Sequence, residues 1–404
     1  LQSFIEALKD HDPIIRFVSY IVSPILAIIA FIFNRRSQQQ MLDLRDEATR
    51  QEKDAEFERH AANEAQAKAI EADGKLKLRQ AEINRLEDDI TKLTKGSETV
   101  WKIRDNRPFP NYHEWRPDPK GTKFITFGNL KGGVGKTTLA INFAAYVSET
   151  LGKRVLLVDL DFQGSMTQTV LLAANNSEVQ SKVQNLFGSN VSLPTFETSI
   201  VHLNQLMSRC TLVPSGYEFN ERENQMLWEA VQRDSSDIDI RYRLAHTLYR
   251  PEVQKQFDVV IFDMPPRMSL GTVNALVASH WLVVPTIIDK LSTEAVTRFL
   301  SQMLALKNDL ELDLKLAAVV GMMHRIYKLN ENEQHILQNV SDELDEWLPN
   351  GFGITNSTIP RKQAIAKLAG EQIPYLASGP DYEKLRNQHF DPLFGEISQR
   401  IGLL

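Results

Sequence analysis

The sequence predicts an α/β fold with a mostly parallel sheet flanked by helices, preceded by an apolar helix and a long heptad-patterned helix. Three observations support this fold class. A glycine-rich turn joins an apolar strand to an amphipathic helix, two later apolar strands end in aspartate, and a proline-free heptad pattern runs from Met41 to Leu93. We therefore expect four segments, which span residues 1–36, 37–95, 96–121 and 122–404.

Composition excludes several classes of protein. The chain has 404 residues, a formal net charge of −6 and one cysteine, Cys210. A protein that coats nucleic acid is normally basic, so the acidic balance argues against that role. A single cysteine excludes an intrachain disulfide framework and a four-cysteine metal site, and it fits a reducing compartment.

Residues 17–33 form an uncharged, mostly apolar run, which predicts a transmembrane helix over 13–33 with Arg16 near one end. Asp12-Pro13 resembles a helix start, and the basic pair Arg35-Arg36 follows the run. A helix needs about 20 residues to cross a bilayer, and basic residues favour the cytoplasmic side. We expect a single-pass protein of the inner (cytoplasmic) membrane whose later residues lie in the cytoplasm. A buried core helix and a cleaved signal peptide are the alternatives.

Residues 37–95 predict a coiled coil. A heptad pattern runs from Met41 to Leu93, and most of its a and d positions are apolar. Such a seam is typical of helices that pair along their length. Many of the seam residues are alanine, and Gly74 weakens the helix further. We expect a parallel dimer; a single solvated helix, an antiparallel hairpin and a contact with another protein are the alternatives.

Residues 96–121 contain several prolines and glycines, which stop helices. They also contain aromatic residues at Trp101, Phe109, Tyr112 and Trp115, which is unusual for a passive linker. We expect these aromatic side chains to pack on the domain that follows. A collar that senses a ligand or binds a partner is the alternative.

The segment from Lys123 to Gly152 predicts a strand, a glycine-rich turn and a helix. The apolar strand Lys123–Gly128 leads into Asn129–Thr138, and the next helix carries an apolar stripe. Successive backbone N–H groups and a helix N-terminus in this arrangement bind phosphate. Lys136 is placed to neutralise the β- and γ-phosphates, and the Thr137 hydroxyl is placed to bind Mg²⁺.

Two further strands end in carboxylates. Residues 154–159 end at Asp159, and Asp161 follows; residues 257–262 lead into Asp263. Ligand sites in α/β proteins lie at the carboxyl ends of parallel strands, and Mg²⁺ prefers oxygen ligands. We therefore expect these aspartates to gather beside the glycine-rich turn.

The motif KGGVGKTT at residues 131–138 resembles the deviant Walker A motif of the ParA/MinD family of P-loop ATPases. The general P-loop pattern has glycine where Leu130 stands, whereas the deviant form opens with a lysine, here Lys131. Residues 159–165 are similar to the family's DxDPQG segment, with Phe162 in place of proline. Residues 257–266 resemble its Walker B strand, and 358–361 its late nucleotide-side loop. The resemblance covers about residues 122–404.

This resemblance implies a role for each matching residue. The ATP-binding positions would be Gly132, Gly133, Val134, Gly135, Lys136, Thr137, Thr138 and, near the adenine, Pro360. The Mg²⁺ positions would be Thr137, Asp159 and Asp263. Catalysis would use Lys136, Asp161, which positions the attacking water, and Lys131, which reaches the partner's phosphates across an ATP-sandwich dimer.

The resemblance also implies slow hydrolysis of ATP to ADP and phosphate, with Mg²⁺, as a dimerisation switch. We expect a homodimer or higher oligomer formed through the ATP sandwich and the coiled coil, a membrane contact through residues 13–33 and an unidentified protein partner. The switch would recruit, position or signal to that partner in partitioning, envelope organisation or defence. The alternatives are a P-loop tyrosine kinase of the polysaccharide-export type and a non-hydrolysing membrane scaffold. DNA is a candidate partner that the acidic balance does not support.

Overall fold

The computed structural model describes residues 101–102, 109, 111–176, 180–232, 238–288, 290–324, 347, 352–368 and 370–404, with the single positions 28, 35 and 74. The chain divides into two compact units, Leu1–Thr99 and Val100–Leu404. Apart from Gly74, the predicted coiled coil over 37–95 lies outside the described residues. Its pairing and the segment boundaries at 36, 95 and 121 stay predictions.

The inner-membrane location expected from the sequence is contradicted. Among the residues that the structure describes, no helix is both long and apolar enough to cross a bilayer. The prediction relied on the hydropathy of residues 13–33, of which only Ile28 is described. The expectation of a single-pass membrane protein is therefore corrected.

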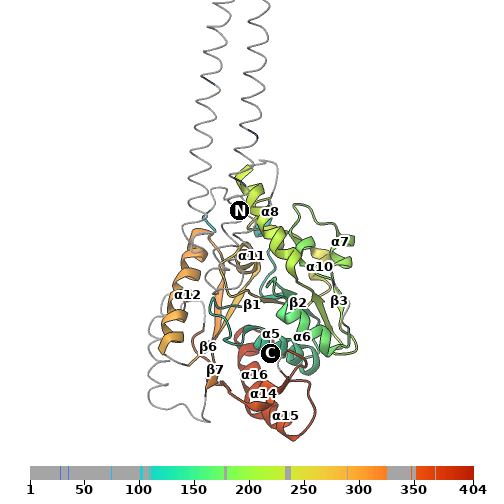
Figure 1. Cartoon of the computed structure of the whole chain (residues 1–404), viewed down its shortest axis with the longest axis vertical. Coiled ribbons are helices and arrows are strands. Elements are labelled where there is room, and N and C mark those ends of the chain that lie inside the picture. Colours follow the sequence, from blue (N-terminus) through green and yellow to red (C-terminus); the bar gives the residue numbers. More distant parts are fainter. Residues whose placement is uncertain are drawn as a thin grey trace, which may run out of the picture. The chain divides into compact units, whose positions relative to one another are not determined.

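The second unit contains a sheet of eight strands in the order β3-β4-β2-β5-β1-β6-β7-β8 (Figure 1). All neighbouring strands run parallel except β3 and β4, which are antiparallel. This arrangement confirms the predicted α/β fold with a mostly parallel sheet. The strands are β1 (Lys123–Phe127), β2 (Val155–Asp159), β3 (Val201–His202), β4 (Cys210–Val213), β5 (Val259–Asp263), β6 (Trp281–Ile287), β7 (Lys315–His324) and β8 (Ile359–Pro360).

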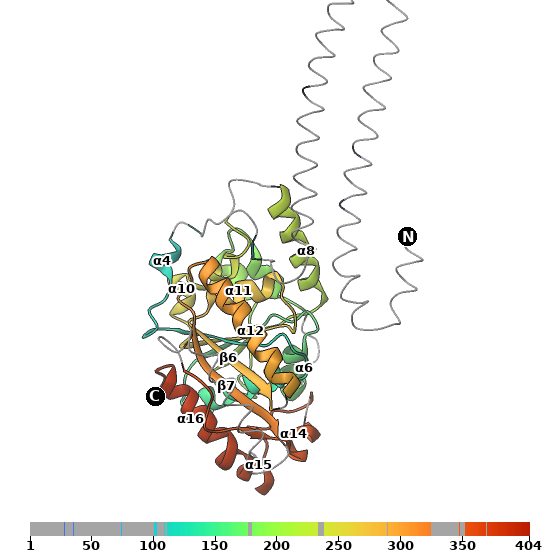
Figure 2. The same ribbon diagram turned by 90° about the vertical axis from the view of Figure 1, so that its left-hand side faces the viewer.

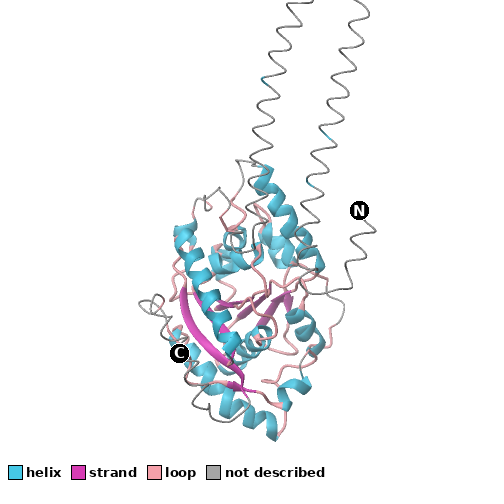
Figure 3. Ribbon diagram, turned by 60° about the vertical axis from the view of Figure 1, so that its left-hand side comes forward, coloured by secondary structure: helices cyan, strands magenta, loops and turns pink. Residues whose placement is uncertain are grey.

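Helices connect the strands and cover both faces of the sheet (Figure 3). The α-helices are α4 (Tyr112–Trp115), α5 (Lys136–Ala145), α6 (Ser165–Ala173), α7 (Leu193–Thr198), α8 (Tyr217–Gln232), α9 (Arg243–Leu248), α10 (Pro251–Gln254), α11 (Leu270–Ala278), α12 (Lys290–Asp309), α14 (Gln363–Leu368), α15 (Pro380–Leu385) and α16 (Asp391–Arg400). Short 3₁₀ or π segments occur at η2 (Tyr146–Thr150), η3 (Val183–Phe187) and η5 (Arg386–Phe390).

The two faces of the sheet carry separate cores because side chains alternate along each strand. On β1, Phe124 enters one core, whereas Ile125 and Phe127 enter the other. The first core contains side chains from α9, α11 and α12; the second contains side chains from α5, α6 and α16. Figure 2 shows α11 and α12 on the opposite side of β6 and β7 from α16. Strands buried on both faces explain the continuous apolar runs in the sequence.

The aromatic residues before β1 pack on the domain, as expected. Trp101, Phe109 and Tyr112 are each no more than 3% exposed and belong to the first core. The Trp101 indole N–H donates to the Asp309 carboxylate at 2.8 Å, and its carbonyl accepts from Arg241 at 2.6 Å. These three residues therefore share the first core with the rest of the unit Val100–Leu404.

Candidate functional site

The loop between β1 and α5 has the backbone that a phosphate site needs. Gly133 and Gly135 adopt left-handed φ values of 72° and 91°, which side chains other than glycine rarely accept. A Cβ on Gly135 would approach the Met322 methyl carbon to 2.9 Å. At Gly132 and Gly133 no atom of the described residues lies within 4 Å of an added Cβ. The backbone is thus open on the side where an anion would approach.

The first turn of α5 offers donors to such an anion. Gly135 is the N-cap residue, and glycine has no side chain that could accept hydrogen bonds from the first N–H groups of the helix. These groups belong to residues of the predicted motif, including Thr137 and Thr138. The positive end of the helix dipole lies at the same place. Together these features make the N-terminus of α5 an anion site.

Lys136 is the first residue of α5, directly after the glycine-rich loop. Its side chain is buried, and its ammonium group donates to the Lys131 carbonyl at 3.0 Å. Burial lowers the pKa of Lys136, and the charges of Asp263 and Asp161 partly oppose that shift. Lys136 therefore lies within electrostatic reach of Asp161 and Asp263, two of the three aspartates that the sequence assigned to the site.

Thr137 and Asp263 form the contact expected of a magnesium site. The Thr137 hydroxyl donates to Oδ2 of Asp263 at 2.6 Å. The other carboxylate oxygen, Oδ1, is buried and has no hydrogen-bond partner among the described residues. Burial and the nearby Asp159 raise the pKa of Asp263 well above its ordinary value. A buried carboxylate with a spare oxygen fits a cation, which would supply the missing positive charge.

The donor set fits Mg²⁺ better than a metal held by protein alone. In the part of the chain that the structure describes, no group of three or more histidine, cysteine, aspartate or glutamate side chains could hold a metal ion. Mg²⁺ commonly keeps several waters and binds through one or two protein oxygens together with substrate phosphates. Thr137 and Asp263 match that arrangement.

Asp159 lies beside Asp263 but has other partners. The two residues are register neighbours on β2 and β5. Oδ2 of Asp159 accepts from the Thr167 amide at 2.9 Å and the Thr167 hydroxyl at 2.7 Å, while Oδ1 accepts from the Asp161 amide at 3.1 Å. Burial raises the pKa of Asp159 to about 7. These contacts fix α6 to the end of β2, and the role of Asp159 toward Mg²⁺ stays a prediction.

Asp161 lies in the turn that follows β2. Its Oδ1 accepts from the Gln163 amide at 3.0 Å, and its carbonyl accepts from the Gly164 amide at 2.8 Å. Burial raises the pKa of Asp161, and the Gln163 amide, Arg267 and Lys136 oppose the shift. Asp161 is thus brought to the same edge of the sheet as Lys136, where its catalytic role stays a prediction.

Lys131 begins the glycine-rich loop and is partly exposed. Its amide donates to Oδ1 of Asn129 at 2.9 Å, and the Asn129 amide group donates to the Pro285 carbonyl at 2.9 Å. Asn129 therefore ties the start of the loop to β6. The contribution of Lys131 to a second subunit stays a prediction.

Pro360 lies on β8, the edge strand of the sheet. It pairs with His324 of β7, while its neighbour Ile359 pairs with Met322, the residue that meets Gly135. The nucleotide-side loop is thus next to residues that border the glycine-rich loop. Contact between Pro360 and a base stays a prediction.

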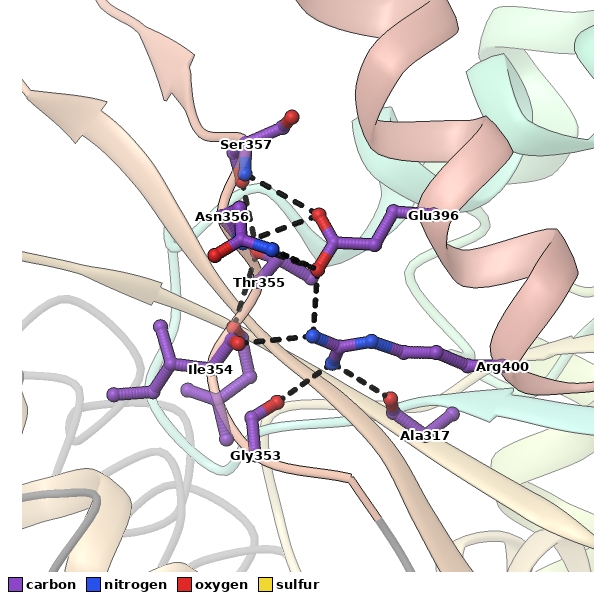
Figure 4. Close-up of polar contacts among 9 residues, drawn as sticks. Ala317, Gly353, Ile354, Thr355, Asn356, Ser357, Glu396 and Arg400 are labelled. Carbon is purple, nitrogen blue, oxygen red and sulfur yellow. Dashed lines mark hydrogen bonds and ion pairs between the residues drawn. The ribbon is translucent and has the colours of Figure 1, made fainter.

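Two residues of the last helix hold the segment that leads to β8 (Figure 4). Arg400 donates to the carbonyls of Gly353 at 2.8 Å, Ile354 at 3.0 Å and Ala317 at 3.1 Å. Glu396 accepts from the Asn356 amide at 3.1 Å and pairs with Arg400 at 2.6 Å. Arg400 and Glu396 therefore link α16, β7 and the segment 353–356 that leads to β8.

Several residues of the site could not be identified from sequence. Asn129 and Thr167 contact predicted site residues through hydrogen bonds, at the Lys131 amide and the Asp159 carboxylate. Glu223 accepts from the Gly271 amide at 2.8 Å and forms an ion pair with Arg267, 44 positions away in the sequence. A polar residue directly before a glycine-rich loop was the one available signal, at Asn129. The others depend on contacts between distant segments.

The sequence is similar to that of known P-loop ATPases over the part of the chain that forms this site. Residues 122–316 match a family model described as an AAA domain. The chain is 31% identical over 202 residues to the chromosome-partitioning ATPase Soj of Thermus thermophilus, covering 50% of this chain and 69% of that protein. It is 29% identical over 201 residues to the sporulation initiation inhibitor protein Soj of Bacillus subtilis, covering 50% and 72%.

A solved structure of an ATP complex of McdA from Cyanothece has the same fold. Its TM-score is 0.54 at 15% identity, and the match covers 70% of this chain and 96% of that one. The Soj relatives, the glycine-rich loop on β1 and α5, and the Thr137–Asp263 pair agree with one another. Family membership makes ATP with Mg²⁺ the ligand of this site. The chain belongs to the ParA/MinD family of P-loop ATPases.

Proposed function

We propose that this chain is an ATP-dependent dimerisation switch. ATP binding favours a pair of subunits, hydrolysis separates them, and the paired state recruits or positions a partner protein. The observation that carries the proposal is the grouping of Lys136, Asp161 and Asp263 within mutual electrostatic reach at the carboxyl ends of three adjacent strands. A scaffold that only bound nucleotide would have no use for a second acidic loop beside the phosphate-binding lysine.

Each residue has a role in the proposed reaction. Lys136 binds the β- and γ-phosphates, as phosphate-loop lysines do. Thr137 and Asp263 would hold Mg²⁺ beside the phosphates. The bound ion neutralises the charge that develops on the phosphates. Asp161 orients the attacking water.

Lys131 provides the reason for the dimer. It lies at the exposed mouth of the loop, next to the open backbone of Gly132 and Gly133. From there its ammonium group would reach the phosphates bound to a second copy. A charge supplied by a partner stabilises the transition state in the manner of an arginine finger. Hydrolysis therefore depends on dimerisation.

The biological setting is proposed from the relatives. The Soj proteins of Thermus thermophilus and Treponema pallidum carry the name chromosome-partitioning ATPase. PomZ of Myxococcus xanthus, 29% identical over 223 residues, is a cell division protein. We infer a partitioning-type role, in which the dimer is the form that binds the partner.

The test measures ATP binding, hydrolysis and mass in solution for the full chain and three variants. Lys136→Ala should lose ATP binding. Asp161→Ala should bind ATP, hydrolyse it about 100-fold more slowly and accumulate as a dimer, because the water is no longer oriented. Lys131→Ala should bind ATP and hydrolyse it slowly. Lys120→Ala, which changes an exposed lysine outside the loop, is the control.

Two results would overturn the proposal. One is normal hydrolysis by Asp161→Ala. The other is an ATP complex of the unmodified chain whose mass, measured by light scattering, equals that of the nucleotide-free protein.

A further inference from the structure

The turn after β2 departs from the family's motif at one position, and the structure shows what packs there. Phe162 stands where the resemblance expects proline. Proline fixes φ at about −65°, so it would restrain the turn that carries Asp161. Phenylalanine has no such restraint. The Phe162 side chain instead packs against the first core, with the Arg267 guanidinium 4.8 Å above its ring centroid.

Arg267 is itself fixed at both ends. Its guanidinium pairs with Glu223, whose side chain is 5% exposed and which also accepts from the Gly271 amide at 2.8 Å. The Arg267 carbonyl accepts from the Thr272 hydroxyl at 2.7 Å. A buried carboxylate requires a paired cation, so the ion pair alone would account for an arginine here. It does not account for the placement of the guanidinium on Phe162.

The contact joins two loops that the reaction must keep in register. Phe162 directly follows Asp161 in the loop after β2, and Arg267 lies four residues after Asp263 in the loop after β5. β2 and β5 are neighbouring strands, so both loops leave the same edge of the sheet. A cation over an aromatic face is attracted to the ring electrons, and this attraction favours one position of a short turn.

We propose that Arg267 is a positioning residue for Asp161, which it holds through Phe162 in place of the restraint that proline would give. The inference rests on the proposed function. Arg267 acts on the hydrolysis step, because the ATP-binding loop belongs to β1 and α5 and makes no part of this contact. A displacement of about 1 Å in a reacting group can reduce a rate about 100-fold.

The expected kinetic signature separates the hydrolysis step from ATP binding. Arg267→Gln and Phe162→Leu should each lower kcat by about tenfold or more, with KM for ATP changed less than about twofold. The double variant should be no slower than the worse single variant, because both changes remove one contact. Arg267→Lys should recover part of kcat, since lysine keeps the charge and loses the planar stack.

Restoring the family residue gives the sharpest test. In a Phe162→Pro background the turn no longer depends on the stack. Arg267→Gln should then lower kcat less than about threefold, against about tenfold or more with phenylalanine present. Equal losses in both backgrounds would show that Arg267 acts by another route. If Phe162→Pro does not fold, the Phe162→Leu double-variant comparison decides the same question.

Two further variants separate the stack from the ion pair. Glu223→Gln with Arg267→Gln removes both charges of the ion pair, so no buried carboxylate is left unpaired, and the double variant should recover the melting temperature that Arg267→Gln loses without recovering kcat. Arg154→Gln is the matched control. Arg154 pairs with Asp258 at 2.7 Å and joins the same two strands at their opposite ends. It should leave kcat unchanged.

A measurement without nucleotide keeps the inference independent of the proposed function. Backbone amide exchange over residues 160–165 should accelerate in Arg267→Gln and Phe162→Leu, but not in Arg154→Gln. Unchanged exchange, or additive losses of kcat in the double variant, would overturn the inference about Arg267. If the variants show this exchange pattern but the unmodified protein has no Mg²⁺-dependent hydrolysis, the inference about the Arg267 contact stands and the proposed ATPase switch is contradicted.

Discussion

The Thr137 hydroxyl lies 2.6 Å from the Asp263 carboxylate, and this bond joins the first turn of α5 to the end of β5. The two residues are 126 positions apart in the chain. The bond places the hydroxyl that the sequence predicts as a Mg²⁺ ligand against a carboxylate whose second oxygen has no hydrogen-bond partner within the described part of the chain. The contact joins the first turn of α5, which follows the glycine-rich loop, to a strand that ends in a predicted metal-site residue.

Replacing Thr137 should separate binding of the metal from binding of the nucleotide. Thr137→Val removes the hydroxyl and should abolish Mg²⁺-dependent hydrolysis, while Thr137→Ser keeps the hydroxyl and most of the activity. The valine variant should also lose about 1–3 kcal/mol of unfolding free energy, because Asp263 loses a hydrogen bond in a buried site. Mg²⁺ titrations of ATPase rate and urea unfolding would measure both effects. Equal Mg²⁺ dependence of the two variants would remove Thr137 from the metal site.

The stability of the nucleotide-free protein should depend on pH through Asp263. Burial raises the pKa of Asp263 in the folded state, so the folded protein holds a proton that the unfolded chain releases near pH ~4. Stability contributed by this group is present below about pH 4 and decreases as pH rises toward the folded-state pKa. The Asp263→Asn variant has no carboxyl group to ionise in this buried position. Its melting temperature should therefore rise relative to that of the unmodified protein as pH increases from about 5 to about 8.

The control for this pH effect is Asp258→Asn. The Arg154 hydrogen bond and charge lower the pKa of Asp258, so that carboxylate is ionised in both states throughout this pH range. The difference between Asp258→Asn and the unmodified protein should stay constant across the same range. If the melting-temperature difference between Asp263→Asn and the unmodified protein is also independent of pH, the pKa of Asp263 is not raised in the folded state.

Arg400 should stabilise the loop before β8. Its guanidinium satisfies the carbonyls of Ala317, Gly353 and Ile354, and its side chain is 14% exposed. Arg400→Ala should lower the unfolding free energy by about 1–3 kcal/mol, because those acceptors lose their donor. Because the loop leads to Pro360, the variant should also raise KM for ATP.

Urea unfolding and steady-state kinetics would measure both effects of Arg400→Ala. Arg209→Ala, a change at an exposed arginine, is the control and should be neutral within about 0.5 kcal/mol. A loss of stability with an unchanged KM for ATP would show that the loop before β8 does not affect nucleotide binding.

Cys210 should be chemically inert in the folded protein. It lies on β4 with 1% exposure, and burial raises the pKa of its thiol. The thiolate is the reactive form, so a thiol reagent should react only as fast as the protein unfolds. Reaction rates with and without denaturant would measure this. Rapid modification of the native protein would place Cys210 at an accessible surface, contrary to its position in the second core.

Local patterns were enough to predict the central part of the fold. The predicted strand over 123–128 is β1, and Gly152, where the predicted helical segment ends, has the left-handed φ of 64° typical of residues after helix ends. The strands that end at Asp159 and Asp263 are neighbours in the sheet. Alternation of strands with helices restricts the topology so strongly that motif order predicts spatial proximity.

Hydropathy was a poor guide outside this domain. The run over 13–33 satisfied the length and polarity expected of a membrane span, and the resulting location was contradicted. Length and polarity alone do not determine the environment of a segment, because a buried core helix has the same composition.

The sequence by itself determined the glycine-rich loop, the strands that end in Asp159 and Asp263, and membership of the ATPase family, because each depends on residues close together in the chain. Only the tertiary structure decided which of the two carboxylates has a spare oxygen. One Asp159 oxygen accepts from Thr167 and the other from the Asp161 amide, whereas Oδ1 of Asp263 accepts no hydrogen bond from any described residue. The tertiary structure alone placed Arg267 on Phe162. Those relationships join loops from different strands, and packing of the whole sheet determines which side chains meet.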